Sequence, residues 1–388
     1  MSDVQRLTGI TWNHTRGFVP MVATAQRFAE THSGIEILWQ KRSLQAFGDQ
    51  PLEQLAPQFD LLVIDHPFVG YAAANPVLLP LDQYLPAEFL KDQAMNSVGK
   101  SYESYVYGLD GHLWALPIDA ATPVSALRPD LLERPPETWE ELLALARRGM
   151  VILPAIPIDS LMHFYMLCIG LGQEPCATPE RVVDADLGAT ALELLRELLS
   201  NCEVPCLERN PIQTYETLAS GGHAAYCPFA YGYTNYARVG YASHILRFGG
   251  LIQFNGAPLR STLGGTGLAI SRSCRHPEVA LAYVQYVASP ACQRGLYVAA
   301  GGQPGHRSAW LDDTANTTTN NFFRDTLPTL DVAFLRPRYY GYMHFQEQAG
   351  LVVHRYLREG GDAHTAVAEL DRLYQESLHS ALHDKVTR

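Results

Sequence analysis

The sequence predicts a two-lobed α/β protein. With 388 residues, the chain exceeds what one hydrophobic core usually supports, and it fits two lobes of roughly 150–200 residues each. Strand patterns alternate with amphipathic helix patterns, which is typical of α/β sheets covered by helices. An extended segment from Pro117 to Pro123 interrupts the alternation, because each proline disfavours a helical residue before it. We expect the chain to pass from one lobe to the other in this segment.

The first elements predict a right-handed βαβ unit with parallel strands. Leu7–Trp12 has a strand pattern, and residues 13–17 form a polar turn. Pro20 is expected to open a helix whose apolar residues recur at helical spacing. Ile35–Trp39 follows as a second strand, apolar at alternate positions. Because strand, helix and strand fit within about 40 residues, a parallel pair is expected.

The remaining elements follow from the same periodicities. The predicted strands are Phe59–Ile64, Val151–Ile156, Ala224–Tyr233 and Ser261–Ser271. The predicted helices are Pro51–Leu55, Glu140–Arg148, Ser160–Leu171, Ala189–Leu199, Pro211–Ser220, His276–Val287 and Ala363–Leu378.

Composition narrows the class of protein. Hydrophobic residues make up 47% and charged residues 18%, as in folded soluble chains. The formal charge of −11 and the lack of basic clusters exclude a nucleic-acid partner. No apolar run reaches the roughly 20 residues of a membrane span. The N-terminus shows no secretory signal pattern. We therefore expect a periplasmic or extracytoplasmic protein if a signal peptide was removed, and a cytoplasmic one if the chain is native as given.

The seven cysteines are scattered and do not form a disulfide framework. Cys202 and Cys206 are close enough in sequence to pair or to bind a metal. No second Cys/His pair at zinc spacing accompanies them, so ordinary buried cysteines are the favoured interpretation. Whether the two pair stays open.

The glycine turn at residues 264–267 does not predict a nucleotide site. It lacks the Lys-Ser/Thr of a phosphate loop, and it precedes a strand instead of following one. Close approach to a small ligand, or a positive φ angle, explains these glycines better.

Candidate binding residues gather where strands are predicted to end. In an open α/β sheet, ligands bind beyond the carboxyl ends of the strands, which selects residues 12–16 and 65–68. Tyrosine and tryptophan suit sugars because a flat ring covers the apolar face of a sugar. Aspartate accepts hydrogen bonds from hydroxyl groups, and arginine can clamp a carboxylate. The candidate set is Trp12, Asn13, His14, Arg16, Asp65, His66, Asp119, Tyr231, Gly265, Thr266 and Tyr339. For each one the competing interpretation is a structural role, as lobe packing, a cap or an ion pair.

The order of several segments resembles a known family. An aromatic–x–Leu-Pro-x-Asp motif ending at Asp119, then Thr122-Pro123-Val124, then Pro136-x-Thr-Trp-Glu-Glu-Leu resembles the family 1 extracellular solute-binding proteins of ABC importers. LGGTGLAIS followed by a helix, then Gly301-Gly302-Gln303-Pro304, fits the same pattern. Nearly the whole chain is covered in segment order.

The resemblance implies a two-lobed periplasmic-binding-protein fold of the maltose-binding type, with a hinge and an interlobe cleft. Mapped here, lobe 1 is 1–117 and 264–315, and lobe 2 is 118–263 and 316–388, with the third crossing at residues 316–321. A sugar, polyol or related small solute would be held by hinge closure and delivered to a membrane permease. No cofactor is implied, and a monomer is expected.

Two alternatives remain open at this stage. The absent signal pattern, together with Arg16 and the two histidines, would also suit an intracellular enzyme or ligand sensor acting on a small carboxylated solute. No hydrolase, β-lactamase or paired-carboxylate motif stands in convincing context, so no catalytic residue is assigned. A metal site built from His14, His66 and Asp65 is a minor hypothesis, since their spacing matches no metal motif.

Overall fold

The computed structural model describes residues 4–386, which divide into two compact units. Unit 1 comprises residues up to Ala121, Leu263–Leu327 and Arg338–Tyr340. Unit 2 comprises Thr122–Thr262, Pro328–Pro337 and residues from Gly341 onward. Both units contain helices and a mixed or antiparallel sheet, which confirms the predicted α/β class.

Unit 1 is built on a five-stranded sheet of order β2-β1-β3-β10-β4. Strands β1 and β2 are parallel in register from Gln5↔Ile35 to Trp12↔Arg42, which confirms the predicted βαβ unit. Strand β10 runs antiparallel to both of its neighbours, β3 and β4. One edge of the sheet therefore holds the carboxyl ends of β1, β2, β3 and β4 together with the amino end of β10. The strands are β1 Gln5–Trp12, β2 Ile35–Arg42, β3 Leu61–Ile64, β4 Leu116–Ala121 and β10 Gly264–Ile270.

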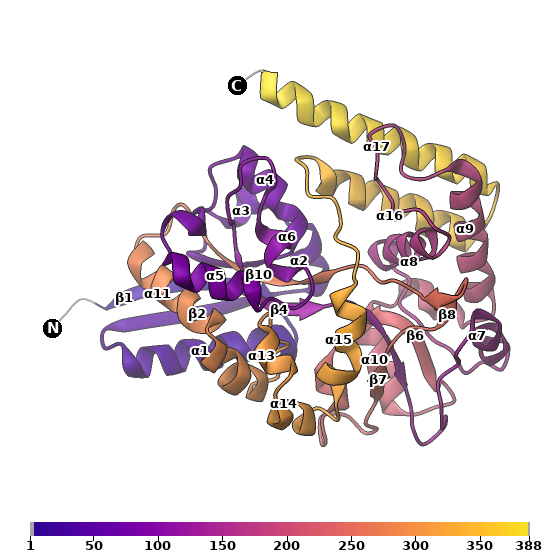
Figure 1. The fold of residues 1–388 in the computed structure, drawn as a ribbon, viewed down its shortest axis with the longest axis horizontal. Coiled ribbons are helices and arrows are strands. Elements are labelled where there is room, and N and C mark those ends of the chain that lie inside the picture. The colour runs from indigo at the N-terminus through magenta and orange to yellow at the C-terminus, as the bar shows by residue number, and fades with distance from the viewer. Residues whose placement is uncertain (1–3, 387–388) are drawn as a thin grey trace. The chain divides into compact units, whose positions relative to one another are not determined.

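Helices surround this sheet, with α1 and α11 among the longest (Figure 1). Helix α1 buries Met21, Ala25 and Phe28 on one face, as the spacing predicts. The helices are α1 Thr15–Thr31, α2 Leu44–Asp49, α3 Leu52–Leu55, η1 His66–Phe68, α4 Val69–Ala74, η2 Leu81–Gln83, α5 Ala87–Met95, α6 Ser101–Tyr105, α11 Pro277–Ala288, α12 Pro290–Cys292, η5 Gln293–Tyr297, α13 Arg307–Trp310, α14 Asp313–Thr318 and the first part of α15 Phe322–Asp331.

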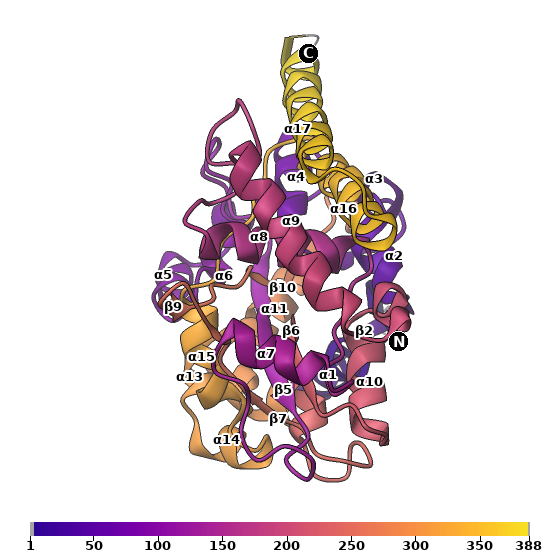
Figure 2. The same cartoon turned by 90° about the vertical axis from the view of Figure 1, so that its right-hand side faces the viewer.

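Unit 2 combines an antiparallel sheet of order β6-β5-β7 with a layer of long helices. Figures 1 and 2 both show α8, α9, α16 and α17 packed together. The rings of Phe345 and Tyr374 lie 5.3 Å apart between α16 and α17. Its elements are β5 Pro123–Leu127, α7 Trp139–Ala146, α8 Pro157–Gly170, α9 Ala185–Ser200, η3 Val204–Glu208, α10 Pro211–Ser220, β6 Tyr226–Tyr231, η4 Thr234–Ala237, β7 Arg247–Gly249, β8 Gln253–Phe254, β9 Ala257–Pro258, α16 Tyr342–Glu359 and α17 Ala363–Val386.

The chain first changes unit between two neighbouring strands. In unit 1, Ala121 pairs with Gly264. In unit 2, the Thr122 hydroxyl donates a hydrogen bond of 2.8 Å to the Thr262 carbonyl. The extended Pro117–Pro123 segment thus spans this change, close to where the prolines place it.

Three local predictions differ from the structure. Helix α1 begins at Thr15 and not at Pro20, because the His14 side chain caps it and Pro20 is accommodated inside the helix. Residues 151–156 form no strand but one bridge at Val151, since Pro154 and then Pro157 end the pairing. Residues 118–121, 316–327 and 338–340 are expected in lobe 2 but belong to unit 1, where Phe322 and Phe323 pack on Trp310.

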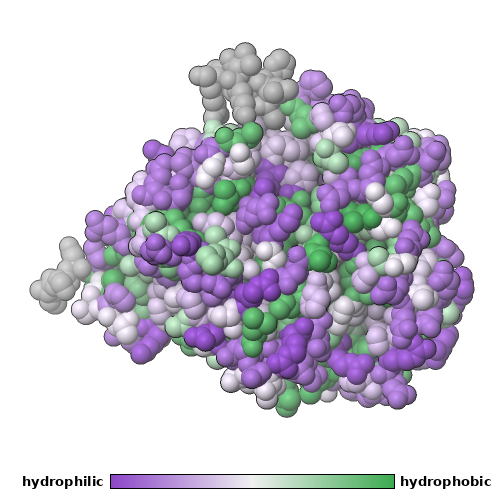
Figure 3. All heavy atoms as spheres, in the orientation of Figure 1, coloured by the Kyte–Doolittle hydropathy of each residue, from purple (hydrophilic) through white to green (hydrophobic). Residues whose placement is uncertain are grey.

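No helix within residues 4–386 is long and apolar enough to cross a membrane. On the face drawn in Figure 3, hydrophobic residues lie scattered among hydrophilic ones. Isolated apolar surface residues of this kind are ordinary for folded proteins.

Candidate functional site

All predicted site residues except Tyr231 belong to unit 1, and most lie at the strand edge described above. Trp12 ends β1 and residues 13–16 follow it, Asp65 and His66 follow β3, and Asp119 lies near the end of β4. Gly265 and Thr266 lie near the start of β10, opposite Ala120 and Asp119. The topology therefore gathers residues that are far apart in sequence, as the strand-end argument predicts.

Arg16 and Asp119 form a buried ion pair with each other. The Arg16 Nε donates to Asp119 Oδ2 at 2.9 Å, and Nη2 bonds to Oδ1 in the same bidentate arrangement. Arg16 is 4% exposed and Asp119 1% exposed. Burial raises the pKa of Asp119, although the Arg16 guanidinium opposes this shift. Arg16 does bind a carboxylate through two hydrogen bonds, as predicted, but that carboxylate is the protein's own Asp119 and not a ligand.

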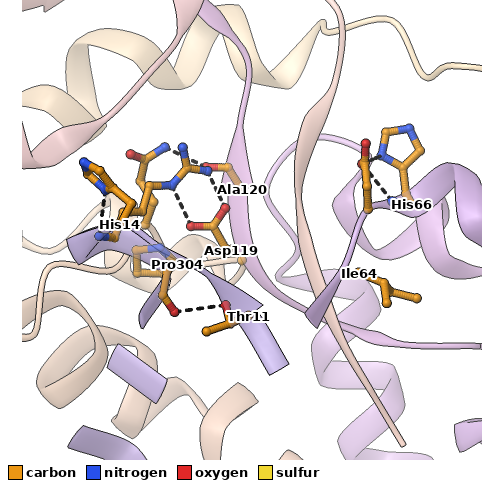
Figure 4. A network of polar contacts seen from close by, with 12 residues as sticks. Thr11, His14, Ile64, His66, Asp119, Ala120 and Pro304 are labelled. Atoms are coloured by element: carbon orange, nitrogen blue, oxygen red, sulfur yellow. Dashed lines mark hydrogen bonds and ion pairs between the residues drawn. The ribbon is translucent and has the colours of Figure 1, made fainter. Parts of the chain in front are cut away.

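His14 is the N-cap of α1. Its Nδ1 accepts a hydrogen bond of 3.0 Å from the backbone N–H of Arg16. Burial, helped by the Arg16 charge, lowers the His14 pKa to about 3. A neutral His14 is required for Nδ1 to accept, so the geometry and the charge state agree. In Figure 4, His14 lies beside the Asp119 ion pair.

Asp65 and His66 form a separate local turn. Asp65 Oδ1 accepts from the His66 backbone N–H at 2.8 Å and lies 3.2 Å from its Nδ1. The buried His66 ring meets Tyr105 edge-on, with centroids 6.4 Å apart. Figure 4 shows His66 well apart from His14 and Asp119. Among the described residues no group of three or more potential ligands could hold a metal ion, so the minor metal hypothesis is wrong for this trio.

Trp12 lies under the first turn of α1 and is only 3% exposed. Its ring packs 5.3 Å from Phe47, and the Arg16 guanidinium lies 5.8 Å from its centroid. A Cβ added to Gly17 would come within 2.3 Å of the indole, so this glycine makes room for the ring. The Trp12 Nε1 is buried and has no hydrogen-bond partner in the part of the chain that the structure describes. Asn13, the next residue, is exposed.

Gly265 and Thr266 lie against β4. Gly265 has φ +101°, and a Cβ there would come within 2.4 Å of the Asp119 carbonyl oxygen. Positive φ and close strand packing therefore explain the glycine. Thr266 is 4% exposed, and its hydroxyl has no hydrogen-bond partner within residues 4–386. Two buried polar groups of this edge, Trp12 Nε1 and Thr266 Oγ1, thus have no hydrogen-bond partner in the described part of the chain.

Tyr339 reaches unit 1 in the short segment Arg338–Tyr340. A Cβ on Gly70 would meet the Arg338 carbonyl at 2.0 Å, so this segment lies directly on α4. The rings of Tyr71 and Tyr340 stack with centroids 6.0 Å apart. Tyr339 is half-buried.

Tyr231 belongs to unit 2, at the end of β6. It is half-buried, and its hydroxyl lies 3.1 Å from Thr262 Oγ1. Its neighbour Phe229 is buried and meets His163 edge-on, with centroids 4.6 Å apart.

Sequence reasoning missed polar residues that the fold buries. Arg42, at the end of β2, stacks 5.3 Å from Phe47 and donates to the Val63 carbonyl at 3.3 Å. Burial lowers its pKa to about 10. In unit 2, burial raises the pKa of Asp159 to about 8 and lowers that of His163 to about 3. Their four-residue spacing on α8 was the available signal, because it places both on one helix face.

Comparison with known proteins gives one family and a consistent set of structures. Residues 23–322 match the model of the bacterial extracellular solute-binding proteins. A maltose-bound MalE3 of T. maritima superposes with TM-score 0.82 and 16% identity, covering 96% of this chain and 99% of that one. A solute-binding protein of an ABC transporter from Agrobacterium radiobacter K84, in complex with ribitol, gives TM-score 0.82, 17% identity, and coverage of 96% and 99%. A solute-binding protein of an ABC transporter from Thermotoga lettingae, bound with α-D-tagatose, gives TM-score 0.80 and 18% identity, covering 96% of this chain and 100% of that one. At these identities the structures show the shared two-lobed fold.

Proposed function

We propose that this chain, which belongs to the bacterial extracellular solute-binding proteins, captures a small polyhydroxyl solute such as a sugar or polyol for an ABC importer. Family membership supports solute binding in place of catalysis. The bound solutes named for the similar structures, maltose, ribitol and α-D-tagatose, support the polyhydroxyl class.

The observation that carries the proposal is a pair of buried polar groups at the edge of unit 1. The Trp12 Nε1 donor and the Thr266 hydroxyl have no hydrogen-bond partner within the described chain. Buried polar groups in folded proteins are usually satisfied, and leaving one unsatisfied costs about 1–3 kcal/mol. The two residues lie on β1 and β10, whose backbones are two strand spacings apart in the sheet, or roughly 10 Å. A solute with several hydroxyl groups can accept from one and bond to the other.

A carboxylated solute loses its main support. That alternative depended on Arg16 as a free clamp, and Arg16 is already bonded to Asp119 at both of the oxygens that a ligand carboxylate would replace. A neutral His14 also offers no positive charge at this edge. The proposed solute is therefore uncharged.

In the proposed mechanism, the solute first bonds to the edge of unit 1, and Tyr231 of unit 2 then contributes an aromatic ring. Binding stabilises the closed state only by the difference in affinity between closed and open states. A membrane permease would recognise the closed state, and its ATPase would drive transport.

A thermal-shift screen against sugars, polyols, amino acids and organic acids tests the solute class. A ligand present at 100 times its Kd should stabilise the protein by about 2.7 kcal/mol. We expect a sugar or polyol to raise the Tm and to be recovered unchanged by mass spectrometry. A response to organic acids alone, or chemical conversion of the hit, would contradict the proposal.

Trp12→Phe then tests the donor directly, because it removes Nε1 and keeps an aromatic ring. We expect a loss of about 1 kcal/mol in binding free energy, or roughly fivefold in Kd. Trp310→Phe is the matched control, since Trp310 is equally buried but its Nε1 already donates to the Pro304 carbonyl at 2.7 Å. The control should lower stability and leave Kd unchanged. Equal affinity in Trp12→Phe and wild type would mean that Nε1 does not bind the solute.

A further inference from the structure

Two cysteines line a cavity in unit 2, and none of the residues that the proposed function uses is among those that line it. The cavity has a volume of about 610 Å³ and is formed by the end of α9, by η3 and by the end of α16. Its lining includes Arg196, Glu197, Cys202, Cys206, Tyr356 and Arg358. The two thiols therefore face a space that a small molecule can enter.

The local backbone holds the two sulfurs together. Cys202 follows α9, and its N–H donates to the Leu199 carbonyl at 3.0 Å. Cys206 lies one turn later in η3, where its N–H donates to the Glu203 carbonyl at 3.0 Å. The Cys202 thiol donates a hydrogen bond of 3.3 Å to the Leu198 carbonyl, and its sulfur lies close enough to Cys206 for the two side chains to interact. Cys202 is half-buried and Cys206 is 1% exposed, but both reach the cavity.

The environment favours a thiolate at Cys206. Interaction with the Cys202 side chain, aided by the Leu153 backbone and by the Arg209 charge, lowers the Cys206 pKa to about 7, although burial opposes this shift. Burial raises the pKa of Cys168, Cys176, Cys227, Cys274 and Cys292 instead. Because the thiolate is the reactive form of cysteine, Cys206 is set apart from these five thiols.

We propose that Cys202 and Cys206 are a modification site, which a peroxide converts into a reversible intramolecular disulfide in the folded protein. The Cys206 thiolate attacks one peroxide oxygen, the O–O bond breaks, and hydroxide leaves to give a sulfenic acid. The Cys202 sulfur then attacks the Cys206 sulfur, the S–O bond breaks, and water leaves with the thiol proton. The protein loses two electrons and two protons, and one hydrogen peroxide becomes two waters.

The disulfide would act on the start of α8. The Cys206 carbonyl accepts a hydrogen bond of 2.9 Å from the Ala155 N–H, and Leu153 donates to the Cys206 sulfur. Residues 153–156 lead directly into α8, which begins at Pro157. Oxidation removes the thiolate that Leu153 bonds to, so the backbone before α8 has to adjust. The oxidation state of the two cysteines would in this way change the backbone conformation at the start of α8 in unit 2.

The test is thiol counting by mass spectrometry on the full folded chain. Wild type is treated with hydrogen peroxide, the reagent is removed, and the protein is alkylated under denaturing conditions. We expect the alkylated thiols to fall from seven to five, and to return to seven after treatment with a dithiol reductant. Peptide mapping should find the bridge within one peptide that contains residues 202–206. Seven alkylated thiols after peroxide, or a bridge to the neighbouring Cys227, would overturn the proposal.

Two variants test whether the sulfenic acid forms at Cys206 before Cys202 closes the disulfide. In Cys202→Ser the sulfenic acid at Cys206 has no partner, so a dimedone adduct at Cys206 is expected in place of the bridge. Cys227→Ser is the matched control, because Cys227 is a buried thiol in the same region, and it should still form the bridge. A dimedone adduct at Cys206 in wild type, with no bridge, would contradict the role of Cys202. Amide exchange at Ala155 should change on oxidation in wild type and stay constant in Cys202→Ser.

Discussion

Asp119 in unit 1 and Asp159 in unit 2 are both buried carboxyl groups, at 1% and 3% exposure, but in the part of the chain that the structure describes only Asp119 of the two is paired with a buried cation. Asp119 accepts two hydrogen bonds from the buried Arg16 guanidinium. Asp159 Oδ2 has no hydrogen-bond partner within residues 4–386, and burial alone raises its pKa to about 8. A charge can be kept inside a protein only when it is paired, and otherwise the group becomes neutral.

The comparison distinguishes two kinds of polar group at the edge of unit 1, those that bond to each other within the protein and those that have no partner among the described residues. The most strongly charged candidates, Arg16 and Asp119, join α1 to β4 and are bonded to each other. The candidate groups that have no hydrogen-bond partner within residues 4–386 are neutral ones, Trp12 Nε1 and Thr266 Oγ1. Charge in a candidate set therefore does not identify the groups that the fold leaves without a partner.

Breaking the paired carboxyl should give the largest effect. Asp119→Ala leaves Arg16 buried without its counter-ion, and removing one partner of such a pair typically costs about 3–5 kcal/mol. Urea unfolding monitored by circular dichroism measures this loss. The double variant Arg16→Met/Asp119→Leu should recover much of it, because no buried charge remains. A single variant as stable as wild type would mean that the pair contributes nothing to the fold.

The unpaired carboxyl should make stability depend on pH in a defined direction. An unfolded aspartate has a pKa of about 3.9, while Asp159 in the folded protein has a pKa of about 8. Below pH ~4 both states are protonated and the group has no effect. Between pH ~4 and 8 the unfolded state ionises first, so the unfolding free energy falls as the pH rises.

Asp159→Asn removes this dependence and keeps the side-chain shape. We expect its stability advantage over wild type to grow from near zero at pH 4 by about 1.4 kcal/mol per pH unit, to roughly 4 kcal/mol at pH 7. Comparing variant with wild type at each pH cancels the opposite contributions of His14 and His163, whose lowered pKa values reduce stability toward acid pH. Parallel pH profiles for the two proteins would contradict the assigned shift.

The smallest effect concerns Tyr231, whose hydroxyl is paired with Thr262 inside unit 2. Tyr231→Phe loses that hydrogen bond and should reduce the unfolding free energy by about 1 kcal/mol. The ring is retained, so the Kd for the solute should hardly change. Thermal unfolding and a binding titration on the same sample check both statements. A large affinity loss would mean that the hydroxyl, and not the ring, contacts the solute.

Much of the fold was predictable because local signals agree with the global arrangement. The apolar periodicities of β1, α1, α9 and α10 match their observed burial. The glycines at the start of β10 predicted a positive φ angle, which Gly265 has, while its close neighbour is the Asp119 backbone. The prediction was wrong where capping decided the boundary, as at His14, and where prolines ended pairing, as after Val151.

The site was predictable in location and not in detail. Strand ends identify an edge, because that follows from sheet topology alone. Which side chains satisfy each other depends on contacts between residues as distant as Arg16 and Asp119, and no local pattern encodes that pairing. The same holds for Asp159, which resembles an ordinary first-turn acid of a helix until its burial is known.

The most direct test of the division between framework and binding groups is a pair of calorimetric titrations with the solute found by screening. Thr11 and Thr266 are both buried threonines of the unit 1 sheet near this edge, but the Thr11 hydroxyl already donates to the Gly17 carbonyl at 3.2 Å. We predict that Thr266→Val weakens binding about fivefold and leaves stability almost unchanged, whereas Thr11→Val lowers stability and leaves Kd unchanged. An unchanged Kd in Thr266→Val, or an equal loss of affinity in both variants, would contradict the account.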